Sequence, residues 1–182
     1  MADSISAKNT LFETSDKSAD FVELFFDLVF VFAITKITHF TAKHLDVEHV
    51  LKSLVIFWLI WWAWTQFTWT LNSSNTRHPI VRMITLVATA VAFVMATATD
   101  RAFDSGVMWF AVPYLLIKAL GLGLQFSVSA DENGQRTAVA GFAAISMTGL
   151  AAVLAGAFAD PSIRIYWWLA AILLDLAAGF IG

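Results

Sequence analysis

Long apolar runs separated by short polar stretches fill the chain after residue 20. Six runs are close to the roughly 20 apolar residues that a helix needs to cross a bilayer. Their expected bounds are Phe21–Phe40, Val50–Leu71, Ile80–Thr99, Val107–Val128, Thr137–Ala159 and Ile163–Ile181. The runs are continuously apolar rather than alternating, which favours helices over the strands of a membrane barrel. The pattern predicts an all-α, polytopic transmembrane helical bundle of about six spans.

The connections between these runs are short, so we expect consecutive helices to be antiparallel neighbours. Residues 1–20 are polar and lack the basic and apolar segments of a signal peptide, so we interpret them as a tail before a transmembrane domain at 21–182. The sequence is still apolar at Gly182. Because a last span is usually followed by polar residues, we expect the N-terminal part of a longer protein.

Composition supports an integral membrane protein. Hydrophobic residues make up 59% of the chain and charged residues 14%, against about 45–50% and about 25% in soluble domains. The absence of cysteine excludes disulfides and thiolate metal sites. The net charge is −3 without a basic block, which argues against a nucleic-acid partner. The lipid bilayer is therefore the expected partner.

Two carboxylates, Glu23 and Asp27, lie four residues apart in the first run and would share a helix face. Glu23 has two interpretations, since Asp20-Phe-Val-Glu23 also fits a capping box. Asp27 would lie about 10 Å into the helix. A carboxylate there is either a proton or cation site, or a structural partner of a neighbouring helix. The same face reaches Thr38, whose hydroxyl can bind a permeating species or the backbone.

Two further charges lie deep in apolar runs. Lys118 is near the middle of the fourth run, on a polar stripe with Tyr114 and Gln125, and Pro113 should kink this helix or free a carbonyl. Asp175 lies within the sixth run. We expect Lys118 to pair with Asp27 or with Asp175, and either pair could be a structural lock or a transport site.

Tryptophan and glycine positions indicate how the helices pack. The second run contains Trp58, Trp61, Trp62, Trp64 and Trp69, too many for all to lie at the membrane interface. We expect Trp61 and Trp62 to pack between helices, with an aromatic, cation-binding wall as the alternative. Small residues in the fifth run, including Gly149 and Gly156, allow close helix approach within the bundle or in a homo-oligomer.

Signals for an enzyme or a cofactor are weak or absent. His39, His44 and His49 are spaced five residues apart and share no helix face, so we predict no metal site. The sequence contains no nucleophile–base arrangement and no phosphate-binding glycine loop. We therefore expect neither a catalytic role nor a cofactor.

The segment Val22-Glu-Leu-Phe-Phe-Asp-Leu-Val-Phe-Val-Phe-Ala-Ile34 closely resembles the opening signature of the bacterial low temperature requirement A (LtrA) family. The resemblance continues through Trp61-Trp-Ala-Trp64, Asn72, Arg82 and Tyr114. It implies a multi-pass protein of the bacterial inner membrane, linked to growth at low temperature. Family members are about twice this length, and the motif resembling Glu-Arg-Phe-Gly-Leu that opens their second half is absent here.

A shorter resemblance links Phe25–Thr35 to the first helix of six-span potassium channels with an Arg-x-x-x-Phe-Ser-Asp signature, although Phe21 and Phe26 replace its arginine and serine. Two functional hypotheses follow. The first is an ion- or proton-coupled transporter or channel with Asp27, Glu23 and Lys118 in its pathway. The second is a non-transporting scaffold or sensor for envelope stress, in which these charges form a structural network.

Overall fold

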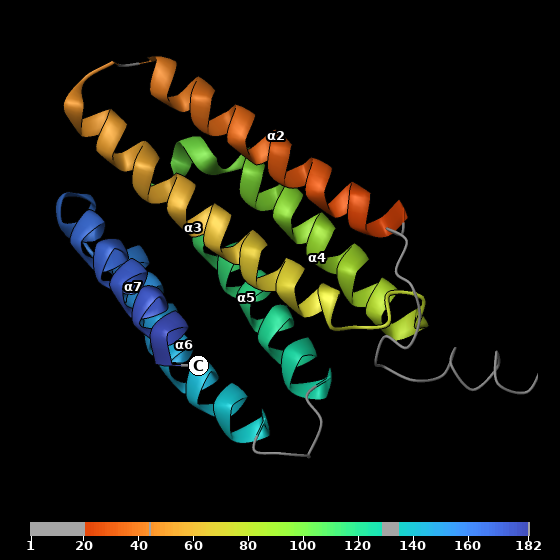
Figure 1. The fold of residues 1–182 in the computed structure, drawn as a ribbon. Coiled ribbons are helices and arrows are strands. Elements are labelled where there is room, and N and C mark those ends of the chain that lie inside the picture. Colours follow the sequence, from red (N-terminus) through yellow and green to blue (C-terminus); the bar gives the residue numbers. More distant parts are fainter. Residues whose placement is uncertain (1–20, 44, 129–134, 182) are drawn as a thin grey trace, which may run out of the picture.

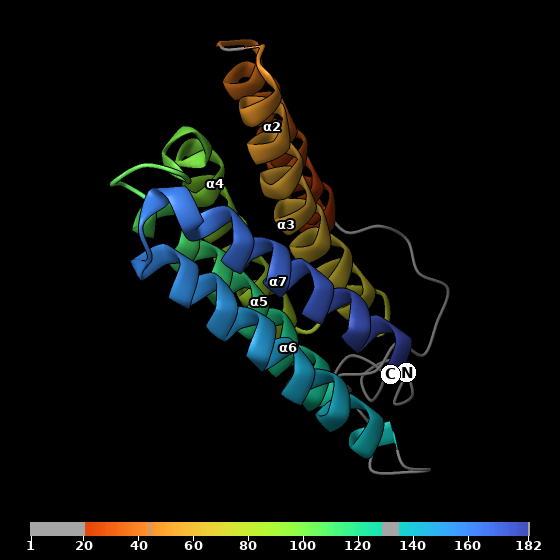
Figure 2. The same ribbon diagram turned by 90° about the vertical axis from the view of Figure 1, so that its left-hand side faces the viewer.

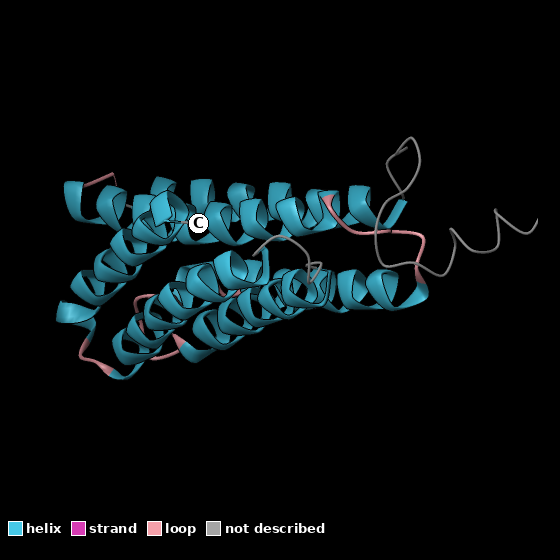
Figure 3. Cartoon of the chain, turned by 60° about the horizontal axis from the view of Figure 1, so that its bottom comes forward, coloured by secondary structure: helices cyan, strands magenta, loops and turns pink. Residues whose placement is uncertain are grey.

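The computed structural model describes residues 21–43, 45–128 and 135–181 (Figure 1). Six α-helices and one short 3₁₀ turn make up the described part of the chain. They are α2 (Phe21–Lys43), α3 (Val47–Asn72), α4 (Pro79–Thr97), η1 (Thr99–Arg101), α5 (Met108–Val128), α6 (Gln135–Phe158) and α7 (Pro161–Ile181). Only helices and loops occur in these ranges (Figure 3). The predicted all-α bundle is therefore confirmed.

Five helices, α3 to α7, are long and apolar enough to cross a membrane. Helix α2 has 23 residues but is not among these five, and it carries Glu23, Asp27 and Lys36. The outward side chains of its first half are nevertheless apolar and include Leu24, Leu28 and Val31, whereas Thr35, Thr38 and His39 are exposed in its second half. Helix α2 therefore combines charged residues with an apolar outer surface along its first half.

Capping residues, rather than the limits of apolar sequence, decide where several helices begin. Helix α3 starts three residues before the expected position because Asp46 caps it, its Oδ1 accepting the backbone N–H of His49 at 2.9 Å. Helix α4 starts at Pro79 and α7 at Pro161, positions that suit proline because the first helical N–H needs no partner. Helix α5 continues through Pro113 to Val128.

The helices pack as a bundle in which α2 contacts α3 and α4, and α5 contacts α3, α4 and α6. Helices α6 and α7 run side by side as a hairpin (Figure 2), and α7 also touches α3. The expectation that consecutive helices are neighbours is wrong for α3 and α4, since α4 packs mainly on α2 and α5. The connection at 73–78 is six residues long and can span up to about 20 Å, enough for the chain to pass a neighbouring helix.

The core is apolar and the outer surface is apolar as well. Buried side chains include Phe26, Leu59, Phe110, Ile117 and Trp168. Large exposed side chains of the same kind occur on every helix, including Leu28, Leu54, Met83, Leu116, Leu154 and Leu173. A helix that is apolar on all sides is typical of a membrane span. Polar groups inside this bundle consequently stand out.

Candidate functional site

A buried ion pair lies between α5 and α7. The Nζ of Lys118 is 3.0 Å from Oδ1 of Asp175, and each residue is only 2% exposed. Lys118 is the eleventh of the 21 residues of α5, so the pair lies near the middle of that span. The structure thus selects Asp175 over Asp27 as the partner of Lys118.

Aromatic side chains and a glycine surround this carboxylate. The Tyr114 hydroxyl donates a long 3.5 Å hydrogen bond to Oδ2 of Asp175 from one turn before Lys118. The Trp62 indole of α3 approaches the same carboxylate without reaching hydrogen-bond geometry. From α6, Gly149 comes so close that an added Cβ would be 3.5 Å from Oδ1. Four helices therefore enclose one carboxylate.

Further polar groups are buried on the helices that enclose the pair. Gln66 follows Trp62 by one turn of α3 and is 5% exposed, and Ser146 precedes Gly149 by about one turn of α6 and is fully buried. Among the described residues, neither the amide of Gln66 nor the hydroxyl of Ser146 has a hydrogen-bond partner. Such groups cost free energy in an apolar interior unless they serve another purpose. Sequence reasoning missed both, although a lone polar residue within an apolar run was the available signal.

Asp27 lies elsewhere, on the α2–α3 contact. Its Oδ1 accepts the indole N–H of Trp64 at 2.8 Å. The two residues are 37 positions apart, and both line an apolar groove of about 320 Å³. A hydrogen bond between Asp27 and a neighbouring helix was the structural alternative, and Trp64 of α3 is the residue that makes it. Because Asp27 also lines the groove, its carboxylate can have a second role there.

The other two candidates on α2 are less enclosed. Glu23 is half-buried in the first turn of the helix, and Asp20, its partner in the expected capping box, lies outside the described residues. The Thr38 hydroxyl donates to the backbone carbonyl of Ile34 at 3.1 Å and is exposed. The backbone alternative for Thr38 is thus the arrangement observed.

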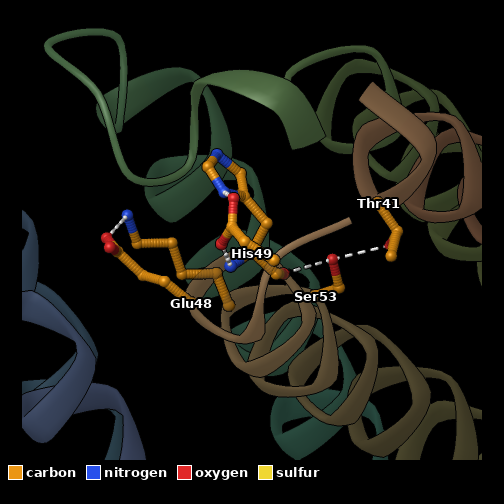
Figure 4. Close-up of polar contacts among 6 residues, drawn as sticks. Thr41, Glu48, His49 and Ser53 are labelled. Atoms are coloured by element: carbon orange, nitrogen blue, oxygen red, sulfur yellow. Dashed lines mark hydrogen bonds and ion pairs between the residues drawn. The ribbon is translucent and has the colours of Figure 1, made fainter. Parts of the chain in front are cut away.

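Polar contacts also gather where α2 ends and α3 begins (Figure 4). The Thr41 hydroxyl donates to Ser53 at 2.7 Å and so ties α2 to α3, while Lys52 pairs with Glu48 at 2.6 Å. Backbone hydrogen bonding from His49 holds the pKa of the Asp46 carboxyl below its usual value. Within the described ranges, no three histidine or acidic side chains are placed to hold a metal ion. His44 lies outside those ranges.

The candidate packing residues lie in two different environments. Gly156 approaches α7 so closely that a Cβ would be 2.8 Å from Trp168. Trp62 lies within 3.5 Å of the Cβ position of Gly179 and stacks on Trp58. Trp61, by contrast, is 37% exposed and lines the groove beside Asp27. Trp62 therefore packs against Gly179 and Trp58, whereas Trp61 lines the α2–α3 groove.

Arg164, another residue that sequence reasoning missed, joins the α6–α7 turn to the start of α5. Its guanidinium is buried and donates to four backbone carbonyls, those of Gly156, Ala159, Ala102 and Asp104, at 3.1 to 3.4 Å. In the sequence it stands just after a polar connection and looks like an ordinary interfacial charge. Its role here is to hold two connections together.

Comparison with known families agrees with this arrangement of helices. The family model described as bacterial low temperature requirement A protein (LtrA) matches residues 18–181. The chain belongs to the LtrA family. As an LtrA member it is a multi-pass bacterial membrane protein tied by its family to low temperature, and the resemblance in the opening signature is confirmed.

A curated relative, an uncharacterized protein (RA0937) of Rhizobium meliloti (strain 1021), is 26% identical over 168 residues. The match covers 89% of this LtrA chain and 40% of the relative, so the chain spans less than half the length of that protein. No solved structure matches the chain.

Proposed function

We propose that this LtrA chain forms part of an ion- or proton-coupled transporter or channel in the bacterial inner membrane, with Lys118 and Asp175 as its charged centre. The observation that carries the proposal is the enclosure of both charges within membrane-spanning helices. Charged side chains at that depth are costly and commonly mark ion or proton pathways. The role is not enzymatic and requires no cofactor.

The surroundings of the pair support a translocation role. Transfer of a proton from Lys118 to Asp175 converts the ion pair into a neutral amine and a neutral carboxylic acid. The net charge of the pair is zero before and after the transfer, so neither state contains a lone buried ion, which would cost more free energy. Tyr114, Gln66 and Ser146 supply hydroxyl and amide groups on neighbouring helices. These groups could relay a proton or replace water around a small cation.

The decisive experiment measures flux of H⁺, K⁺ and Na⁺ into proteoliposomes that contain the purified full-length protein. The double variant Lys118→Met with Asp175→Leu removes both charges together, so that neither remains buried alone. We expect wild-type flux of one cation and none in the double variant, with both proteins eluting at the same size. Equal flux in the two proteins, or none in the wild type, would refute the proposal.

A second candidate function, a non-transporting scaffold or sensor in envelope adaptation to cold, is favoured by a different observation. The pair is direct, and Gly149 seals one side of it, as in a structural lock. In that case the double variant should still restore growth at low temperature to a deletion strain. A transporter that depends on the charges should fail the same test.

A further inference from the structure

The α2–α3 groove holds a carboxylate in an aromatic setting that the transport proposal does not use. It has a volume of about 320 Å³. Its walls come from matching stripes on the two helices. Asp27, Val31 and Ile34 are spaced i, i+4, i+7 on α2, and Phe57, Trp61 and Trp64 have the same spacing on α3. Phe30 and Ile60 complete the lining.

The groove opens to the outside of the bundle. Val31 is 61% exposed at its edge, and Ile34, Phe57 and Trp61 are each exposed by more than a third. On the N-terminal side of the groove the exposed side chains of α2, Leu24 and Leu28, are apolar, whereas the polar Thr35, Thr38 and His39 are exposed toward the C-terminal end of the helix. A ligand would therefore enter from the hydrocarbon side, which requires that it be lipophilic.

The ligand must also match the charge of the groove. Within the part of the chain that the structure describes, only one oxygen of Asp27 has a hydrogen-bond partner, the Trp64 N–H at 2.8 Å, which also fixes the orientation of the carboxylate. Among the described residues, no lysine, arginine or histidine lies within ion-pair distance of Asp27. A carboxylate facing a low-dielectric region attracts a cation strongly when one can reach it. Charge complementarity thus favours a positive ligand.

The aromatic walls favour the same ligand. The rings of Phe30, Phe57, Trp61 and Trp64 line a groove that ends on a carboxylate. Aromatic faces attract organic ammonium and similar cations, most strongly where water is excluded. A small hydrated metal ion would gain little from such walls, whereas a cation with alkyl or aryl substituents gains from both features.

We propose that the groove between α2 and α3 binds a lipophilic organic cation, with Asp27 as its counter-charge and the four aromatic residues as its walls. The positive centre would lie at the free oxygen of Asp27, and the apolar substituents would extend along Val31 and Ile34 toward the lipid. Binding here does not depend on Lys118 or Asp175, so it can be measured whether or not the protein transports ions.

The test uses radiolabelled tetraphenylphosphonium as the probe, with the purified protein in lipid nanodiscs. Its charge-reversed isostere, tetraphenylborate, has the same shape. We expect saturable binding of the cation at least tenfold tighter than that of the anion. Equal binding of the two probes would mean that the groove takes any apolar molecule, such as a lipid chain, and would overturn the proposal, as would absence of cation binding.

Variants locate the site. Asp27→Asn keeps the size of the side chain and an oxygen for the Trp64 N–H but removes the charge, and should weaken cation binding at least tenfold. Val31→Trp fills the groove from its exposed edge and should abolish saturable binding. Glu48→Gln is the matched control, because it removes a carboxylate of α3 outside the groove and should bind like the wild type.

Wild-type affinity in Asp27→Asn and Val31→Trp would overturn the proposal. If Asp27→Asn fails to fold, Val31→Trp still decides the question, since the valine side chain is apolar and the substitution keeps the backbone carbonyl that accepts the Thr35 hydroxyl. Loss of binding equally in Glu48→Gln would show that the effect of Asp27 reflects overall charge, and would also count against the site.

Discussion

The Nζ of Lys118 on α5 lies 3.0 Å from Oδ1 of Asp175 on α7, and helix α6 lies between these two helices in the sequence. Each is almost completely removed from solvent, so each depends on the other to offset the cost of burial. This mutual dependence leads to the first prediction.

Replacing one member of the pair should destabilise the fold far more than replacing both. Asp175→Leu leaves the Lys118 ammonium buried alone and should lower the free energy of unfolding by about 3–5 kcal/mol. The double variant Lys118→Met with Asp175→Leu should recover most of that loss. Thermal unfolding in one detergent, followed by loss of helical circular dichroism, checks both. Additive losses would contradict the interdependence of the two charges.

Close approach of α6 and α7 leads to the second prediction. A Cβ at Gly156 would be 2.8 Å from the Trp168 ring and 2.9 Å from the Trp167 Cβ, so Gly156→Ala must push the helices apart. We expect a loss of about 1–3 kcal/mol. Gly141→Ala is the control on the same helix, since no atom of the described residues outside the local helix backbone lies within 4 Å of its Cβ position.

Alanine at Gly141 should leave stability unchanged or raise it by up to about 1 kcal/mol, because glycine weakens a helix interior. Thermal unfolding of the two variants in the same detergent makes the comparison. Equal effects at both positions would show that backbone preference, rather than contact with Trp168, governs the result.

The helices were predictable from sequence because each needs a long apolar segment, and the runs supply it directly. The partner of Lys118 was not. Depth along a helix follows from position, but the direction in which Lys118 points relative to Asp27 and Asp175 depends on how three helices are rotated. The Asp27–Trp64 hydrogen bond was hidden for the same reason, since it joins residues 37 positions apart. The helices that α4 contacts also depend on the path of the connection at 73–78, and the pattern of apolar residues does not determine that path.

Arg164 supplies the third prediction. Its planar guanidinium donates to carbonyls of both the α6–α7 turn and the segment before α5. The variant Arg164→Lys keeps the positive charge, but its ammonium cannot reach all four carbonyl acceptors. Some buried carbonyls therefore lose a hydrogen-bond donor. We expect a loss of about 1–3 kcal/mol in unfolding free energy. Arg77→Lys, at an exposed arginine in the α3–α4 connection, should change stability little, and an equal effect would argue against the carbonyl contacts.

The cap of α3 should make stability depend on pH at the acidic end. Hydrogen bonding from His49 lowers the pKa of Asp46 in the folded protein, so folding favours its ionised form. The resulting stabilisation is present above the usual aspartate pKa of about 3.9 and is lost as pH falls through the lower folded value.

Asp46→Asn keeps a capping oxygen without a titrating charge. Its midpoint of thermal unfolding should therefore fall less steeply than that of the wild type as pH drops below about 4. Parallel curves for the wild type and Asp46→Asn would show that the ionised cap contributes nothing beyond its hydrogen bond, since only a pKa difference between folded and unfolded states can change the slope.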